Sequence, residues 1–216
     1  MVSWILALGS KEIAVALPFF IFLYEWFFFQ HCSISWIRSN ARLLAGALLV
    51  LGLAVLAYTD FDPFRAILSG YVHRDFTPIQ RVFTQFRVIV FYIGLVIYPH
   101  PSRLSLLHDF DISRTLIDPP TTLLCAAVLA AALFWACRHV RKDPLISFSI
   151  LWFFGNLALE SSVVSLEIIF EHRTYLPSML AVFAVTTLTF RAIKRPAASA
   201  TLLCLVAAVF SLSTYE

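Results

Sequence analysis

The most informative group of ionisable side chains in the chain lies between Glu160 and Arg173. Glu167, Glu171 and His172 complete the group. Read as a helix with 3.6 residues per turn, the segment places its three carboxylates within about 40° of one another. A stripe of carboxylates beside an apolar segment predicts the wall of a polar pocket, in which Arg173 binds a phosphate and a glutamate binds a hydroxyl or a metal. The alternative is a solvated ion-pair cluster at the start of the next apolar segment.

A second group with chemical potential is the stretch Arg81–Arg87, which directly precedes the apolar run Val88–Tyr98. Read as a helix, this stretch places Arg81, Thr84 and Gln85 on one face. A guanidinium group matches the oxygens of a phosphate better than an ammonium group does, so one interpretation is a phosphate clamp. The other is a pair of arginines whose charged ends reach to the membrane surface.

Two smaller groups carry weaker signals. Lys11 and Glu12 stand at a turn before an apolar run, where Lys11 could bind an anionic headgroup or the pair could simply neutralise itself. His108, Asp109 and Asp111 lie within four residues and could bind a divalent cation. Short acidic loops of this kind are usually only solvated, so we assign neither a metal nor any other cofactor to this chain. A divalent cation stays an open alternative for the full-length protein.

The composition decides which kind of framework must position these groups. Of the 216 residues, 60% are apolar and 13% are charged, and the mean hydropathy is +0.84. An average soluble domain has about 25% charged residues, so this chain has too little polar surface for a water-soluble globule. The net charge of +3 is too small to indicate a nucleic-acid partner.

Runs of apolar residues predict an all-α fold, a polytopic transmembrane helical bundle of about six spans plus one re-entrant or interfacial helix. The run Val88–Tyr98 has only 11 residues before Pro99, too few to cross a bilayer, so we expect it not to span. The six longer runs are Ile13–Phe29, Leu43–Tyr58, Thr121–Cys137, Leu145–Leu159, Tyr175–Phe190 and Ala197–Ser213.

Charge placement orients this bundle. Three short connectors, His31–Arg42, Arg138–Asp143 and Arg191–Arg195, are rich in arginine and lysine, which indicates cytoplasmic loops. Six spans place all three on the same side, whereas a crossing by Val88–Tyr98 would separate them. We therefore expect one transmembrane domain over residues 1–216. Its outer side carries a long extracytoplasmic segment with the interfacial helix (59–120) and a shorter motif segment (160–174).

Several blocks of this sequence resemble a known family. The chain is similar to bacterial polytopic membrane proteins with C-terminal tetratricopeptide repeats, which are related to the TMTC-type protein O-mannosyltransferases of the GT-C glycosyltransferase superfamily. The similar blocks are Ser10-Lys11-Glu12 through Pro18, Leu23-Tyr24-Glu25, Phe83 through Val88 and Tyr92, Leu104-Ser105-Leu106, Asp118-Pro119-Pro120, Glu160-Ser161-Ser162, and Phe170-Glu171-His172-Arg173 through Ser178.

The resemblance implies an enzyme, a hexosyltransferase in the bacterial inner membrane, which moves a sugar from a polyprenyl-phosphate carrier to a protein or glycan acceptor, with protein O-glycosylation the expected outcome. It also implies that this chain is the GT-C-like C-terminal membrane portion, because the family's acidic catalytic loop would lie upstream of Met1 and its repeats downstream of Glu216. Leu107 departs from the family pattern, in which an acid stands, so we assign no catalytic base.

On this reading, the substrate-binding residues are those expected at the outer interface, and the partners are the sugar lipid, the acceptor and membrane lipids. The alternative is a non-catalytic membrane anchor or scaffold for periplasmic tetratricopeptide repeats. The candidate substrate-binding residues are Lys11, Glu12, Arg87, Glu171, His172, Arg173 and Tyr175.

Overall fold

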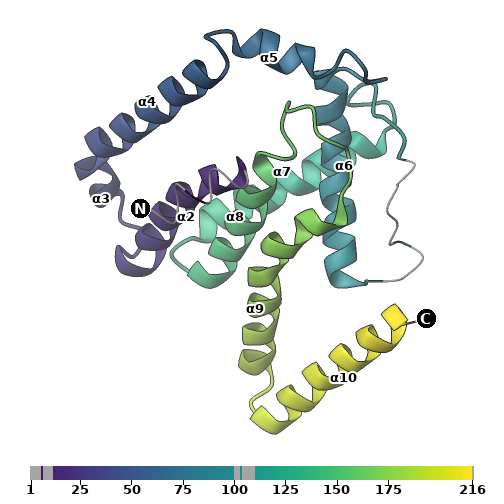
Figure 1. The fold of residues 1–216 in the computed structure, drawn as a ribbon. Coiled ribbons are helices and arrows are strands. Elements are labelled where there is room, and N and C mark those ends of the chain that lie inside the picture. Colours follow the sequence, from purple (N-terminus) through teal and green to yellow (C-terminus); the bar gives the residue numbers. More distant parts are fainter. Residues whose placement is uncertain (1–5, 7–11, 100–102, 104–109, 216) are drawn as a thin grey trace.

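The computed structural model describes residues 6, 12–99, 103 and 110–215, and every regular element in this part of the chain is helical (Figure 1). The first half contains η1 (Glu12–Ala16), α2 (Leu17–Tyr24), the π-helical η2 (Glu25–Phe29), α3 (Ile34–Ser39), α4 (Ala41–Tyr58) and α5 (Pro63–Ser69). The second half contains α6 (Pro78–Ile97), α7 (Thr121–His139), α8 (Pro144–Ala158), η4 (Glu171–Thr174), α9 (Tyr175–Ala192) and α10 (Pro196–Tyr215).

This architecture confirms the predicted all-α helical bundle and indicates a multi-pass membrane protein. Among the described residues, five helices are long and apolar enough to cross a membrane. Four of them coincide with predicted runs, and the fifth is α6. The other two predicted runs form shorter apolar helices. The five are Ala41–Tyr58, Pro78–Ile97, Thr121–His139, Glu171–Ala192 and Pro196–Ser213, and the shorter two are Ala14–Phe29 and Pro144–Ala158.

The expected 11-residue helix at Val88–Tyr98 is wrong in its bounds, because this run is the second half of α6. The helix begins at Pro78, where Thr77 and Gln80 form a reciprocal capping box. The Thr77 hydroxyl accepts from the Gln80 amide N–H, and the Gln80 side chain accepts from the Thr77 amide N–H. A capping box with proline in the first turn is a strong signal for the start of a helix. Here it starts the helix ten residues before the apolar run begins at Val88.

Two non-helical stretches of chain lie along α6, and their contacts indicate how deeply this helix is inserted in the membrane. Phe110 packs near Phe91, Ser113 bonds to Thr84, and the backbone at Ile168 bonds to Gln85. Irregular backbone at membrane depth is tolerated only where protein or a water-filled cavity covers it. The contacts of α6 therefore favour a position at the membrane surface, and its non-spanning character stays a prediction.

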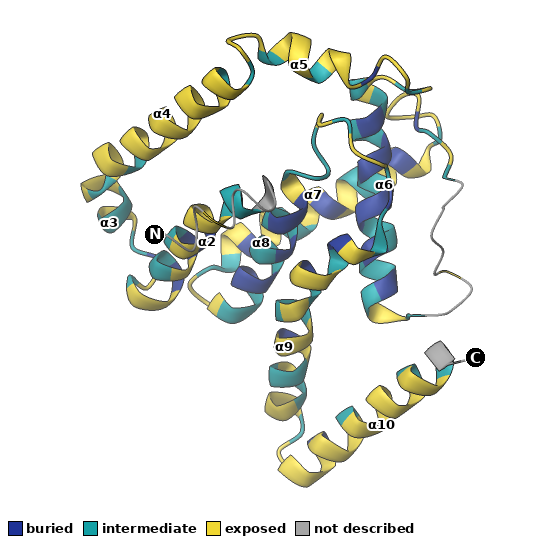
Figure 2. Ribbon diagram, viewed as in Figure 1, coloured by how far each residue is buried: buried dark blue, intermediate teal, exposed yellow. Residues whose placement is uncertain are grey.

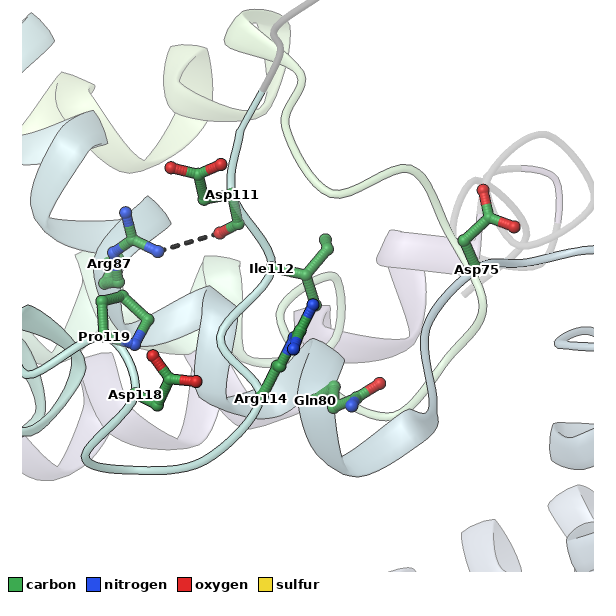
Figure 3. Close-up of a pocket in the computed structure, with 8 residues that line it drawn as sticks. All are labelled: Asp75, Gln80, Arg87, Asp111, Ile112, Arg114, Asp118 and Pro119. Carbon is green, nitrogen blue, oxygen red and sulfur yellow. Dashed lines mark hydrogen bonds between the residues drawn. The ribbon is translucent and has the colours of Figure 1, made fainter.

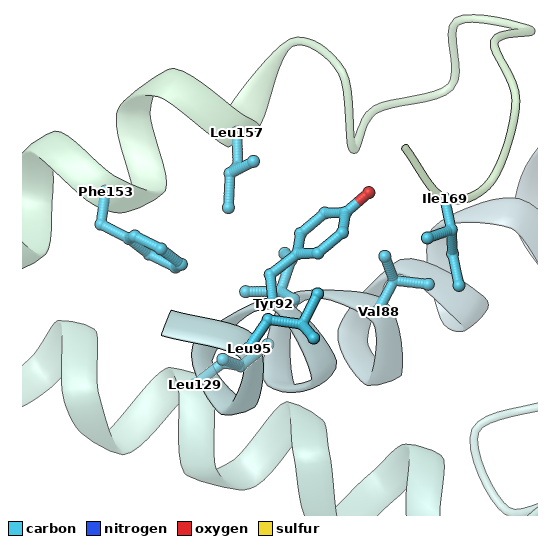
Figure 4. Close-up of a cluster of buried hydrophobic side chains, with 8 residues drawn as sticks. Val88, Tyr92, Leu95, Leu129, Phe153, Leu157 and Ile169 are labelled. Carbon is cyan, nitrogen blue, oxygen red and sulfur yellow. The ribbon is translucent and has the colours of Figure 1, made fainter. Parts of the chain in front are cut away.

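The core lies where α6, α7, α8 and the end of the 159–170 loop meet. Tyr92 is at the centre of this cluster, between Val88 on its own helix and Leu157 on α8 (Figure 4). The close van der Waals packing of these side chains fixes α6 against its neighbours. The buried members are Val88, Ile89, Tyr92, Leu95, Leu129, Phe153, Leu157 and Ile169.

A smaller cluster joins the N-terminal helices to α8. Phe27 and Leu23 pack against Phe148, and Cys32 lies beside them in the turn before α3. The Cys32 thiol donates to the Val140 carbonyl at 3.5 Å. Burial raises the pKa of this thiol, although the nearby Arg141 lowers it, and the net shift keeps the sulfur protonated.

Helices α4 and α10 extend away from both clusters (Figures 1 and 2). None of the α4 span and only 6% of the α10 span is buried within the protein. Both helices are apolar along their length, and α4 exposes leucine and valine side chains on all sides. In a membrane, lipid covers such surfaces, because the bilayer core is as apolar as these side chains.

Candidate functional site

Helix α6 carries polar side chains on two faces, and each face holds a different segment. Arg81, Gln85 and Tyr92 are buried and face the loop of residues 159–170, hereafter called the outer loop after its predicted extracytoplasmic position. Thr84 and Arg87 contact residues 111–113, which return along the helix. Arg81 and Gln85 share one face, as predicted, because four residues separate neighbours on a helix surface. Thr84, which is also predicted on that face, contacts Ser113 instead.

Arg81 is fully buried and binds the backbone of the outer loop. Its guanidinium donates to four carbonyl oxygens, those of Glu160, Ser162, Leu166 and Glu167, at 2.5–3.3 Å. The planar fork of five N–H donors suits this arrangement of several acceptors around one side chain. Arg81 therefore organises the outer loop, and its guanidinium has no pair of N–H groups left to bind a phosphate.

Three more side chains fasten the same loop. Gln85 donates to the Ile168 carbonyl at 2.9 Å, and the Tyr92 hydroxyl accepts from the Phe170 amide N–H at 2.9 Å. From the turn after α5, the Tyr71 hydroxyl donates to the Val163 carbonyl at 2.8 Å. Burial raises the pKa of Tyr71, despite opposing arginines, so its hydroxyl remains a donor at neutral pH.

Arg173 is part of this interior network. Its side chain is 5% exposed, its Nε lies 3.4 Å from a carboxylate oxygen of Glu160, and its Nη1 donates to the Glu167 carbonyl at 2.8 Å. The guanidinium carbon lies 5.1 Å from the centre of the Phe170 ring. These contacts give Arg173 a structural role. To bind a phosphate, as expected from the sequence, Arg173 would have to break these contacts.

The predicted helical stripe of Glu160, Glu167 and Glu171 is wrong, because residues 159–170 form turns, bends and irregular chain. The carboxylates point to different partners, Glu160 to Arg173 and Glu167 to Arg74 at 2.7 Å. The physical reason is that side chains of α6 supply the hydrogen bonds that a helix would have supplied to this backbone.

The remaining sequence-predicted residues do not gather at one place. Lys11, His108 and Asp109 lie outside the described residues, as does the side chain of Glu12. Glu171 is half-buried, His172 is exposed with its ring 5.1 Å from that of Phe170, and Tyr175 is 84% exposed. Within the described ranges, no cluster of three histidine, cysteine or acidic side chains has the arrangement of a metal site.

A polar pocket of about 590 Å³ lies on the other face of α6 (Figure 3). It brings together the turn before α6, the first half of α6 and the segment before α7. Two of its residues, Arg87 and Asp111, belong to the groups that the sequence predicts to do chemistry, and the others do not. The lining residues are Asp75, Gln80, Arg87, Asp111, Ile112, Arg114, Asp118 and Pro119.

Arg87 is held in a fixed orientation at this pocket. Its Nη1 donates to the Asp111 carbonyl at 2.8 Å and to the Ser113 hydroxyl at 3.4 Å (Figure 3). The guanidinium carbon lies 4.7 Å from the centre of the Phe110 ring. Ser113 is itself buried, with its amide donating to Thr84. A positioned arginine loses less side-chain entropy on binding an anion than a mobile one does.

The turn from Arg114 to Asp118 forms the outer wall of the pocket. The Asp118 carbonyl accepts from the Arg114 and Thr115 amides at 2.9 and 3.3 Å, and the Asp118 amide donates to the Thr115 hydroxyl at 3.0 Å. These bonds use the backbone of the turn and leave the ionic ends of Arg114 and Asp118 available. The pocket can therefore bind an anion through arginine and hydroxyl or ammonium groups through carboxylates.

Comparisons of this chain with known protein families, with curated proteins and with solved structures found no match. The fold and the site together define a helical, multi-pass membrane protein with a mixed-charge pocket beside α6.

Proposed function

We propose that this chain is the membrane portion of a GT-C type glycosyltransferase that uses a polyprenyl-phosphate-linked sugar at the outer face of a bacterial inner membrane. The proposal starts from the resemblance of the motif segments described above. The observation that carries it is Arg87, a pre-oriented guanidinium at a polar pocket within a protein whose helices suit a membrane. Protein O-glycosylation is the outcome that this proposal expects.

The pocket residues have roles that follow from their chemistry. Arg87 and Arg114 bind the phosphate of the carrier, because charge-assisted hydrogen bonds from guanidinium to phosphate are among the strongest polar contacts. In the transfer, the bond from the sugar's anomeric carbon to the carrier phosphate breaks and a bond to an acceptor hydroxyl forms. Guanidinium groups stabilise the phosphate that leaves. No residue of this chain is assigned as the base that takes the acceptor's proton.

The test is binding of polyprenyl phosphate to the purified chain in lipid nanodiscs. Arg87→Ala is compared with Arg65→Ala, which removes an exposed arginine on α5. Loss of one arginine–phosphate contact should weaken binding about tenfold or more. The Arg65 variant should bind within about twofold of the unaltered chain, since surface charges away from a site contribute little. Equal binding by the two variants would contradict the proposal.

A second candidate function is a membrane scaffold for periplasmic repeats. The observation in its favour is that Arg81 and Arg173, both buried, bind the outer loop and make it rigid. A folded chain that binds no polyprenyl phosphate in the same nanodiscs would favour this scaffold over the transferase.

A further inference from the structure

The pocket beside α6 contains ionic groups of both signs that do not pair with one another. Among the described residues, no hydrogen bond or ion pair engages the carboxylates of Asp75, Asp111 and Asp118 or the guanidinium of Arg114. Arg87 bonds to the backbone of Asp111 and not to its carboxylate. The other acids that lie against α6 are paired, Glu160 with Arg173 and Glu167 with Arg74.

The charge balance of the pocket favours a phosphate ligand that also brings a positive charge. Three carboxylates and two guanidinium groups leave one net negative charge around a cavity of about 590 Å³. A phosphate placed on Arg87 or Arg114 would also face Asp111 and Asp118 in the same lining, and like charges repel. A protonated amine elsewhere on the ligand would turn that repulsion into attraction, because ammonium donates to carboxylates.

We propose that this pocket selects a phosphate ester that also carries a protonated amine. The arginines bind the phosphate and the aspartates bind the ammonium group. This inference rests on the proposed function for the phosphate and adds the amine as the group that decides specificity. Two sources share this chemistry, an amino-sugar phosphate and the headgroup of an aminophospholipid.

The experiment compares two probes that differ only in an amine and a hydroxyl, glucosamine 1-phosphate and glucose 1-phosphate. Binding is measured by calorimetry on the chain in nonionic detergent, which contributes no phosphate. The amine-bearing probe should bind at least about tenfold more tightly, because one charge-assisted hydrogen bond contributes about that much to the affinity. Equal affinity of the two probes would overturn the inference.

Carboxylate variants locate the effect. Asp118→Asn and Asp75→Asn should each reduce the preference for the amine about threefold or more, with little loss of glucose 1-phosphate binding, since they remove only an ammonium partner. Asp60→Asn, in an exposed turn outside the pocket, is the matched control and should keep the preference. If the preference survives both pocket substitutions, the ammonium group binds elsewhere, and the inference is overturned.

Lipid competition then separates the two sources. Displacement of glucosamine 1-phosphate by phosphatidylethanolamine but not by phosphatidylglycerol supports an aminophospholipid headgroup. Persistence of the bound probe against both lipids supports an amino-sugar phosphate. Absence of binding by either sugar phosphate, in a chain that still binds polyprenyl phosphate, would overturn this inference and leave the proposed function standing.

Discussion

Arg81 and Arg87 are six residues apart on the same helix, and their surroundings give them opposite roles. Arg81 is buried and donates to four carbonyl oxygens of the outer loop. Arg87 is half-buried and oriented by Asp111, Ser113 and the Phe110 ring at the edge of a pocket. One arginine holds the chain together, and the other is available to a ligand.

Replacing Arg81 with lysine should destabilise the protein by about 2–4 kcal/mol, because an ammonium group cannot reach four carbonyls at once and buried acceptors are left without donors. The free energy of unfolding in mixed detergent micelles is the measurement. Arg65→Lys, on the exposed surface of α5, should change it by less than about 0.5 kcal/mol. A stable Arg81→Lys variant would show that the outer loop does not depend on this contact.

Tyr92→Phe should cost about 1–3 kcal/mol, because it leaves the Phe170 amide without its acceptor in a buried place. Tyr175→Phe makes the same chemical change at a side chain that is 84% exposed, and it should be nearly neutral. The two variants are compared in the same unfolding measurement. Equal stability of the pair would contradict the role assigned to the Tyr92 hydroxyl.

At the scale of elements, α6 is the centre to which two irregular segments attach. Its start is set locally by Thr77, Pro78 and Gln80. The outer loop and the 110–114 segment have few backbone bonds of their own and depend on α6 side chains for order. The turn after α5 closes the arrangement, because Gly70 lies directly against Ser165 of the outer loop.

Gly70→Ala should destabilise the protein by about 1–3 kcal/mol, since a Cβ there would overlap the Ser165 side chain and push the outer loop away. Gly46→Ala on α4 is the matched control. Nothing lies within 4 Å of the corresponding position, so alanine should be neutral or stabilise the helix by up to about 1 kcal/mol. Thermal unfolding in detergent compares the two variants, and a loss in Gly46→Ala as large as that in Gly70→Ala would contradict the contact.

The helices were predictable from the sequence because their signals are local. Apolar runs located α4, α7, α9 and α10, and the spacing of Arg81 and Gln85 predicted their shared face. The helical interpretation of the spacing of Glu160, Glu167 and Glu171 fails, because the groups that satisfy the backbone of this loop come from α6, about 80 residues away in the chain. The pocket was missed for the same reason, since Asp75, Arg87 and Asp118 meet only after the chain folds back along α6.

At the scale of the whole molecule, charge placement predicts a basic inner side and an outer side that carries the pocket and the outer loop. Arg42 lies in the first turn of α4, and the connectors after α7 and α9 contain Arg141, Lys142 and Lys194. These basic residues favour the cytoplasm. Helices α4, α6, α7, α9 and α10 have the length to cross, and the shorter α8 must also cross to keep the connectors after α7 and α9 on one side. The contacts of α6 with irregular chain favour a place for it at the membrane surface.

Topology reporters fused after Arg42, Ile117, Lys142 and Arg195 test this arrangement. The fusions after Arg42, Lys142 and Arg195 should report the cytoplasm, and the fusion after Ile117 should report the outer side. A cytoplasmic signal after Ile117 would place the pocket on the inner side, which would contradict the proposed access to a carrier lipid.

The most direct test of the central claim is photocrosslinking of a photoreactive polyprenyl phosphate to the chain in nanodiscs, followed by identification of the labelled peptides. The account predicts label on the first half of α6 and on residues 110–119, with less label in Arg87→Ala and unchanged label in Arg65→Ala. Label confined to α9 and α10, or equal in the two variants, would contradict it.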